Sequence, residues 1–107
     1  MVPERKDDEM LDLEALFEKY EDEYIRFERE INPKHPRPDV CAFLLLHELA
    51  PHEMPGRDMI AAAEHDEIWL DAEVDTVAEN ATEEQIVTLI RCGVRFDRQN
   101  HAFAMFA

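Results

Sequence analysis

Glycine and cysteine are scarce in this chain of 107 residues, and long apolar runs are missing. Two glycines leave no room for a glycine-rich loop that would cradle a phosphate group. Two cysteines, Cys41 and Cys92, are too few to staple a small secreted domain, and their apolar neighbours favour buried free thiols. The longest apolar run, residues 40–46, is too short to span a bilayer, and no apolar leader precedes it. We therefore expect a cytoplasmic protein.

Positive charge is also scarce: 26 acidic residues stand against 11 lysines and arginines, which gives a formal net charge of −15. A chain this acidic repels phosphate, so we expect no direct binding to nucleic acid and none to an anionic membrane. Its apolar content of 46% is too high for a disordered acidic tail. The length is that of a single domain with a modest core.

The negative charge lies in two separate parts of the chain. Residues 1–31 hold 12 acidic and 5 basic residues, a net charge of −7, whereas residues 32–58 are nearly neutral at −1. Residues 59–90 hold nine carboxylates and no lysine or arginine, and residues 91–107 carry +2. The sequence thus predicts two acidic surfaces separated by a nearly neutral apolar middle.

Residues 1–31 have the pattern of one long amphipathic helix. Its apolar residues recur at steps of 3 and 4, the a/d spacing of a heptad: Met10, Leu13, Phe17, Tyr20, Tyr24, Phe27 and Ile31. Asp7 or Asp8 can cap its start, and Asn32 followed by Pro33 ends it. The stripe either packs on the rest of the domain, because its aromatic residues are bulky for a tight coiled coil, or forms a self-pairing or partner-binding helix, because a heptad this regular also suits a homodimer.

A proline-rich joint at residues 32–38 separates this segment from an α+β body at residues 39–107. Asp39 is expected to cap a short, almost wholly apolar helix, Val40–Leu49, which Pro51 ends. Thr82 and Gln85 form a capping box that opens a second helix, and Gly93 can close it.

Two hairpins are predicted from alternating apolar and polar residues. The first joins Met59–Ala63 to Glu67–Glu73, with Ile68, Leu70 and Ala72 facing inward and Trp69, Asp71 and Glu73 facing outward. The second joins Val94–Phe96 to Ala102–Phe106. The predicted fold is therefore a single two-layer α+β domain. It has a long N-terminal helix, a short apolar helix and a four-stranded antiparallel sheet of two hairpins with a helix between them.

Metal and catalytic motifs are weak. His47 and His52 are five residues apart with Pro51 between them, so they cannot present two imidazoles to one zinc from an unbroken helix. Cys41 or His35 would add donors, but their spacing matches no common zinc motif. We therefore expect no metal, no cofactor and no enzymatic activity.

The most specific functional signal is the acidic stretch that surrounds Trp69. It is either a solvated face or a surface presented to a basic partner, because clustered carboxylates repel one another and a partner would relieve that repulsion. An exposed tryptophan there would be a natural binding anchor. The predicted partner-binding residues are Glu64, Asp66, Glu67, Trp69, Asp71, Glu73, Asp75, Glu79, Glu83 and Glu84.

Residues 67–107 resemble small bacteriophage accessory proteins. The resemblance is carried by Ile68–Val74, Ala78–Gln85, Leu89–Asp97 and Phe103–Phe106, covers about 40 of 107 residues and contains no catalytic signature. It implies a viral accessory protein acting in the host cytoplasm, and by analogy with anti-CRISPR and other host-takeover inhibitors it suggests a DNA mimic.

Three functions follow from these observations as alternatives. The first is a non-enzymatic acidic protein, encoded by a phage, that binds a basic, nucleic-acid-binding surface of a host protein through residues 64–84 and the polar face of the first helix. The second is a homo-oligomeric structural or assembly component that uses the heptad helix. The third is a small metal- or ligand-binding protein with its site near Cys41, His47 and His52.

Overall fold

A computed structural model describes residues 11–51 and 59–106. The helices are α1 (Leu13–Lys19), α2 (Pro38–Leu49), α3 (Val74–Asn80) and α4 (Glu83–Arg91), and the strands are β1 (Ile60–Glu64), β2 (Glu67–Leu70), β3 (Arg95–Asp97) and β4 (Ala102–Phe106). Two single turns of 3₁₀ helix, Glu21–Glu23 and Phe27–Arg29, follow α1. The fold is α+β, as the sequence predicted.

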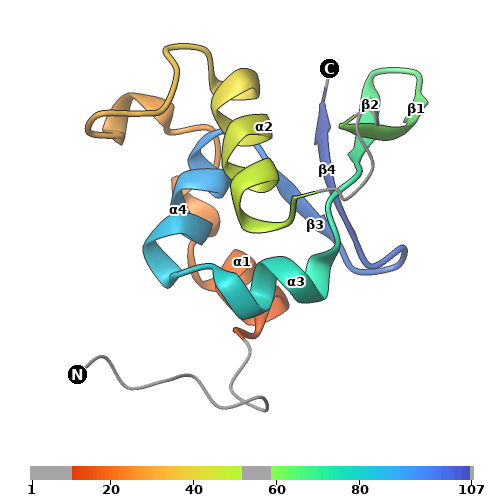
Figure 1. The fold of residues 1–107 in the computed structure, drawn as a ribbon. Coiled ribbons are helices and arrows are strands. Elements are labelled where there is room, and N and C mark those ends of the chain that lie inside the picture. Colours follow the sequence, from red (N-terminus) through yellow and green to blue (C-terminus); the bar gives the residue numbers. More distant parts are fainter. Residues whose placement is uncertain (1–10, 52–58, 107) are drawn as a thin grey trace.

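The four strands form one antiparallel sheet in the order β1-β2-β4-β3, so the two predicted hairpins are joined through β2 and β4. In that central pair Ile68 is opposite Met105 and Leu70 is opposite Phe103. These four residues share one face and belong to or pack against the buried core. The helices lie to that side of the sheet (Figure 1).

The hydrophobic core lies between the helices and this face of the sheet. Its largest fully buried side chains come from every layer: Phe103, Leu46, Ile86, Leu89, Ile90, Val77, Val94 and Cys41. Burying such side chains stabilises the fold by about 1.5–3 kcal/mol each relative to leaving them in water. Both cysteines lie in this core, as predicted.

Helix α2 confirms the prediction of a short apolar helix, with one correction at its start. Arg37, not Asp39, is the N-cap residue, because Pro38 occupies the first helical turn, where its missing N–H costs no hydrogen bond. Asp39 lies inside that turn, and its carboxylate accepts a hydrogen bond from the Arg37 guanidinium at 3.3 Å. Residues 32–37 contain no helix or strand, as their prolines predicted.

Helix α4 begins and ends as its sequence predicted. The Thr82 hydroxyl accepts a hydrogen bond from the Gln85 amide at 3.2 Å, while the Gln85 side chain accepts one from the Thr82 amide at 2.9 Å. At the other end Gly93 has φ +95°, and its amide and that of Val94 donate to the carbonyls of Ile90 and Leu89, each at 3.0 Å. This is the Schellman arrangement, which requires the left-handed conformation that glycine adopts without strain.

Helix α3 was not predicted, and the predicted strand Glu67–Glu73 is too long. Strand β2 ends at Leu70, and the residues up to Glu73 connect it to α3. Val74, Val77 and Ala78 are buried at helical spacing, which places α3 in the core. The outward strand positions predicted for Asp71 and Glu73 are therefore wrong, although Ala72 is buried as expected.

The long N-terminal helix is not formed over the described residues. Asp12 caps α1 by accepting a hydrogen bond from the Ala15 amide at 3.1 Å, and the helix ends at Lys19. The predicted caps Asp7 and Asp8 lie outside the described residues. Ile25 has φ +56°, a left-handed conformation that an α-helix does not contain.

The predicted seam residues mostly pack on the core of their own chain. Leu13 is buried, and Phe17, Tyr20, Tyr24 and Phe27 are partly buried against the core, whereas Ile31 is exposed. Met10 lies outside the described residues. The packing alternative therefore accounts for these five residues, and self-association through the remainder stays a prediction.

Candidate interaction surface

The sheet has a second face, on the side away from the helical core. The register places Trp69, Ala104 and Arg95 side by side across β2, β4 and β3. None of them belongs to the core cluster, although the small Ala104 side chain is itself fully buried. We call this side of β2, β3 and β4 the open sheet face. Trp69 lies on it, as predicted, and is half-buried rather than fully exposed.

A carboxylate from the neighbouring hairpin fixes Trp69 in place. The indole N–H donates a hydrogen bond of 2.8 Å to the Asp97 carboxylate, which also accepts from the Asn100 side chain at 2.7 Å. The amides of Gln99 and Asn100 donate to the same carboxylate at 3.1 and 3.2 Å. Asp97 thus holds the β3–β4 turn and the tryptophan ring together, so Trp69 presents a preordered aromatic surface.

An arginine on the open sheet face neutralises one predicted partner-binding residue. Arg95 forms an ion pair with Glu67, and its guanidinium carbon lies 4.3 Å from the centre of the Phe106 ring. Phe106 is 58% exposed, so the open sheet face offers apolar as well as charged contacts. Glu67 is engaged within the molecule and contributes less negative charge to a partner than its sequence position suggests.

Other carboxylates of the acidic stretch are paired with groups distant in sequence. Glu83 accepts hydrogen bonds from the Tyr20 hydroxyl and from Lys19, the latter at 3.1 Å. Asp75 lies 3.1 Å from the Nε2 atom of His101. The stretch has no lysine or arginine of its own, but its fold brings cations to it from the N-terminal and C-terminal segments.

Four predicted acids are exposed and have no ion pair with any described residue: Glu64, Asp66, Glu73 and Glu84. They come from the β1–β2 hairpin and from the N-terminal ends of α3 and α4, which lie apart from one another (Figure 1). Glu84 lies in the first turn of α4, where the helix dipole favours a carboxylate. Asp71 and Glu79 both interact within the molecule and are not part of this set.

A second carboxylate cluster was not predicted. Arg91 donates to Glu30 at 2.7 Å and to Glu23 at 2.9 Å, and Glu23 also pairs with Arg29. The Thr88 hydroxyl donates to Glu30 at 2.8 Å. The sequence contained no signal for this cluster because its members are about 60 residues apart and the bent chain at residues 20–30 brings them together.

Because several carboxylates accept hydrogen bonds in the folded protein, we expect the protein to lose stability in acid. Hydrogen bonds lower the pKa of three carboxylates. For Glu23 the donors are Arg91 and, with a smaller effect, Arg29. For Glu83 they are Tyr20 and then Lys19, and for Asp97 they are Trp69 and then Asn100. A lowered folded-state pKa adds stability above the unfolded value of about 4, and this stability is lost as the pH falls below it. Urea unfolding followed by Trp69 fluorescence should show a constant midpoint from pH 7 to 5 and a falling one below about pH 4. A midpoint that rises in acid would contradict the pairing.

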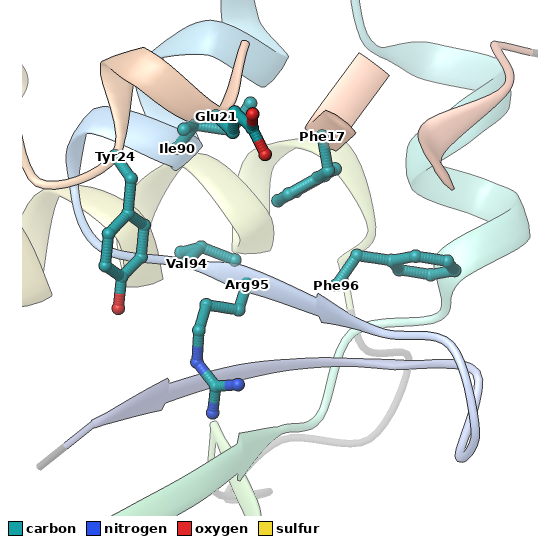
Figure 2. A pocket seen from close by; sticks show the side chains of 7 residues that line it. All are labelled: Phe17, Glu21, Tyr24, Ile90, Val94, Arg95 and Phe96. Carbon is teal, nitrogen blue, oxygen red and sulfur yellow. The ribbon is translucent and has the colours of Figure 1, made fainter. Parts of the chain in front are cut away.

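A hollow that the sequence did not predict lies beside the edge strand β3. Its volume is about 280 Å³, and it opens between the segment after α1 and β3. Its apolar walls are formed by Phe17, Tyr24, Ile90, Val94 and Phe96. Figure 2 shows Tyr24 on one side, Phe17 and Phe96 on the other, and Glu21 at the rim. We call this the β3 hollow.

Cys41 and His47, the two described donors of the predicted ligand site, do not converge. Cys41 is buried in the core, whereas His47 is exposed on the last turn of α2, and His52 lies outside the described residues. In the described part of the chain, no group of three or more His, Cys, Asp or Glu side chains is arranged to hold a metal ion. Burial raises the pKa of the Cys92 thiol far above its usual range, so Cys92 is a poor nucleophile.

Comparison with protein-family models, with curated proteins and with solved structures finds no match to this chain in any of the three. The fold defines the class of protein: an α+β domain with helices on one face of a four-stranded antiparallel sheet. No helix in residues 11–51 and 59–106 combines the length and apolar character needed to cross a bilayer.

Proposed function

We propose that this chain is a non-enzymatic interaction protein that binds a basic surface of a partner protein through the acidic stretch from Glu64 to Glu84. The observation that carries the proposal is the set of four exposed carboxylates that form no ion pair within residues 11–51 and 59–106, on a chain of net charge −15. Negative charge on a protein surface raises the association rate with a basic surface and disfavours partners of like charge.

The arrangement separates two roles within the stretch. Glu67, Asp75 and Glu83 are held by groups of the same chain, so they shape the surface. Glu64, Asp66, Glu73 and Glu84 remain available to a partner's lysines and arginines. Trp69 adds an aromatic surface whose position Asp97 already fixes, so binding costs little side-chain entropy there.

A basic surface patch is the electrostatic footprint of a protein that binds nucleic acid. Together with the resemblance to small phage proteins, this leads us to propose a phage-encoded inhibitor whose carboxylates occupy the place of phosphates on a host protein. Its mechanism is occlusion: the bound protein covers the groove, and nucleic acid is excluded by competition. No bond is made or broken.

The test compares two variants of equal net charge. Glu64→Gln, Asp66→Asn and Glu73→Gln together remove three of these four exposed carboxylates. The matched control, Glu18→Gln with Asp22→Asn and Glu28→Gln, removes three exposed carboxylates of the N-terminal segment that likewise have no ion pair among the described residues. We expect the first variant to bind a basic protein captured from a bacterial lysate roughly tenfold more weakly, as three exposed ion pairs predict, and the control to bind normally.

The same captured protein should release bound nucleic acid when the unmodified chain is added, and raised salt should weaken both effects. An affinity that does not change with salt concentration, or an equal loss of affinity in both variants, would contradict the proposed surface. Equal loss in both would show that total charge matters and the position of the carboxylates does not.

A further inference from the structure

The β3 hollow combines aromatic walls with one carboxylate, which is the chemistry that recognises an alkylammonium group. Phe17 and Tyr24 lie on opposite sides of it, and the Glu21 carboxylate extends from the rim toward Phe17 (Figure 2). The faces of aromatic rings attract a cation electrostatically, and a nearby carboxylate completes the pairing.

Two cations near Glu21 are already engaged: Lys19, two residues before it in the sequence, and Arg95, which lines the same hollow. Lys19 forms an ion pair with Glu83 and lies 5.1 Å from the centre of the Tyr20 ring. Arg95 lines the hollow, but its guanidinium points away from Glu21, toward β4, where it pairs with Glu67 (Figure 2). The Glu21 side chain has no hydrogen bond or ion pair with any described residue, so a positive charge from outside would find it unpaired.

The size of the hollow limits what it can hold. Its volume of about 280 Å³ is below the range of about 300–1,000 Å³ in which small-molecule and cofactor sites fall. One long side chain matches this volume better than a cofactor does. The walls are apolar along most of their length, which suits the methylene stem of a lysine, while Glu21 suits its charged end.

We infer that the β3 hollow receives a lysine side chain of the partner protein. This inference rests on the proposed function, because a basic partner supplies such side chains, and it adds a specific contact to what would otherwise be a general attraction of charge. The hollow lies beside Arg95 and Phe96 of β3, next to the open sheet face that carries Trp69. A single partner surface could therefore contact both.

The probe is Nα-acetyl-lysine N-methylamide, compared with the norleucine derivative, which has a similar apolar stem and no charge. Titration into the isotope-labelled full chain should move the backbone amide signals of Val94, Arg95 and Phe96 with saturation. We expect the lysine probe to bind at least threefold more tightly than the norleucine probe, the ratio expected for an exposed ion pair.

Substitutions at Glu21 and Tyr24 separate the contributions of the carboxylate and of the aromatic ring to binding of the probe. Glu21→Gln should abolish the preference for the charged probe, and Glu21→Lys should prevent its binding. Glu18→Gln, which removes an exposed carboxylate from α1, should leave the preference unchanged and serves as the matched control. Tyr24→Leu keeps apolar bulk but removes one aromatic face, so it should weaken binding of the lysine probe more than of the norleucine probe.

Equal binding of the two probes, or an unchanged preference in Glu21→Gln, would overturn the inference. Tighter binding of free n-butylammonium than of the capped lysine would also overturn it, by showing a site for free amines. The result is separate from that of the proposed function. If the hollow fails to bind while partner capture still depends on Glu64, Asp66 and Glu73, only the lysine site is excluded.

Discussion

Replacing Phe103 with alanine should lower the free energy of unfolding by about 4 kcal/mol. Phe103 is fully buried at the centre of the sheet, on β4, and its ring centre lies 6.2 Å from that of Phe17 and 6.3 Å from that of Phe96. Truncation removes the buried ring and leaves a cavity that Phe17 and Phe96 cannot fill without moving. Domains of this size are stable by about 5–15 kcal/mol, so much of the total would be lost. Urea denaturation followed by the fluorescence of Trp69, the single tryptophan, measures it.

The matched control lies three residues further along the same strand. Phe106 is 58% exposed on the open sheet face and contacts the Arg95 guanidinium, so Phe106→Ala should cost about 1 kcal/mol or less. Equal losses for the two variants would mean that the core does not lie on the Phe103 face of the sheet. A large loss of stability in Phe106→Ala alone would show that the Phe106 face of the sheet, and not the Phe103 face, packs on the core.

Short-range features of the fold were predictable because their physical causes are local. The capping box at Thr82 and Gln85 and the closure at Gly93 each depend on residues within one helical turn, and both are present in the structure. The two hairpins and the apolar helix followed from periodicity in the same way. What could not be predicted was the pairing of β2 with β4, which joins residues 33 to 39 positions apart.

Helix α3 was missed because two periodicities overlap in the sequence. The alternation that begins at Ile68 continues through Glu73, so the strand pattern extends beyond its true end at Leu70. Only burial of Val74, Val77 and Ala78 against α2 distinguishes a helix there from an extended segment. Tertiary packing decided between two locally acceptable structures.

The candidate interaction surface was predictable in composition but not in pairing. The absence of lysine and arginine from residues 59–90 correctly identified an acidic stretch. It did not indicate that Arg95, Lys19 and His101 would each reach one of its carboxylates from other segments. The fold thus reduces the number of unpaired acids, and the β3 hollow, whose walls come from the N-terminal and C-terminal parts of the chain, had no local signature.

The N-terminal segment shows how a tertiary contact overrides a helical pattern. In a continuous helix, Glu23 and Glu30 would lie about 10.5 Å apart along the axis, since each residue adds about 1.5 Å. In the structure both carboxylates bind the one guanidinium of Arg91, and the chain between them bends through a left-handed Ile25. A β-branched residue in that conformation is strained, so the bend persists because other contacts hold it.

Arg91→Met should therefore release residues 20–31 and lower the free energy of unfolding by about 2 kcal/mol, the order expected for charged hydrogen bonds lost from a partly buried group. Glu30 keeps its bond from Thr88 and Glu23 keeps Arg29, so the helices and the sheet should remain folded. The amide of Ile25, which donates to the Ile90 carbonyl at 3.2 Å, should lose its protection from hydrogen exchange.

The control for this experiment is Arg29→Met, which removes an exposed partner of Glu23 and leaves Arg91 in place. Its expected cost is small, because Arg29 is half exposed and solvent screens its pairing. Arg91→Lys restores the charge but not the planar fork that reaches two carboxylates at once, so it should recover only part of the stability. Full recovery by lysine would show that charge alone holds the segment. Unchanged exchange at Ile25 in Arg91→Met would show that the apolar contacts of Phe17, Tyr24 and Phe27, and not the shared guanidinium, impose the bend.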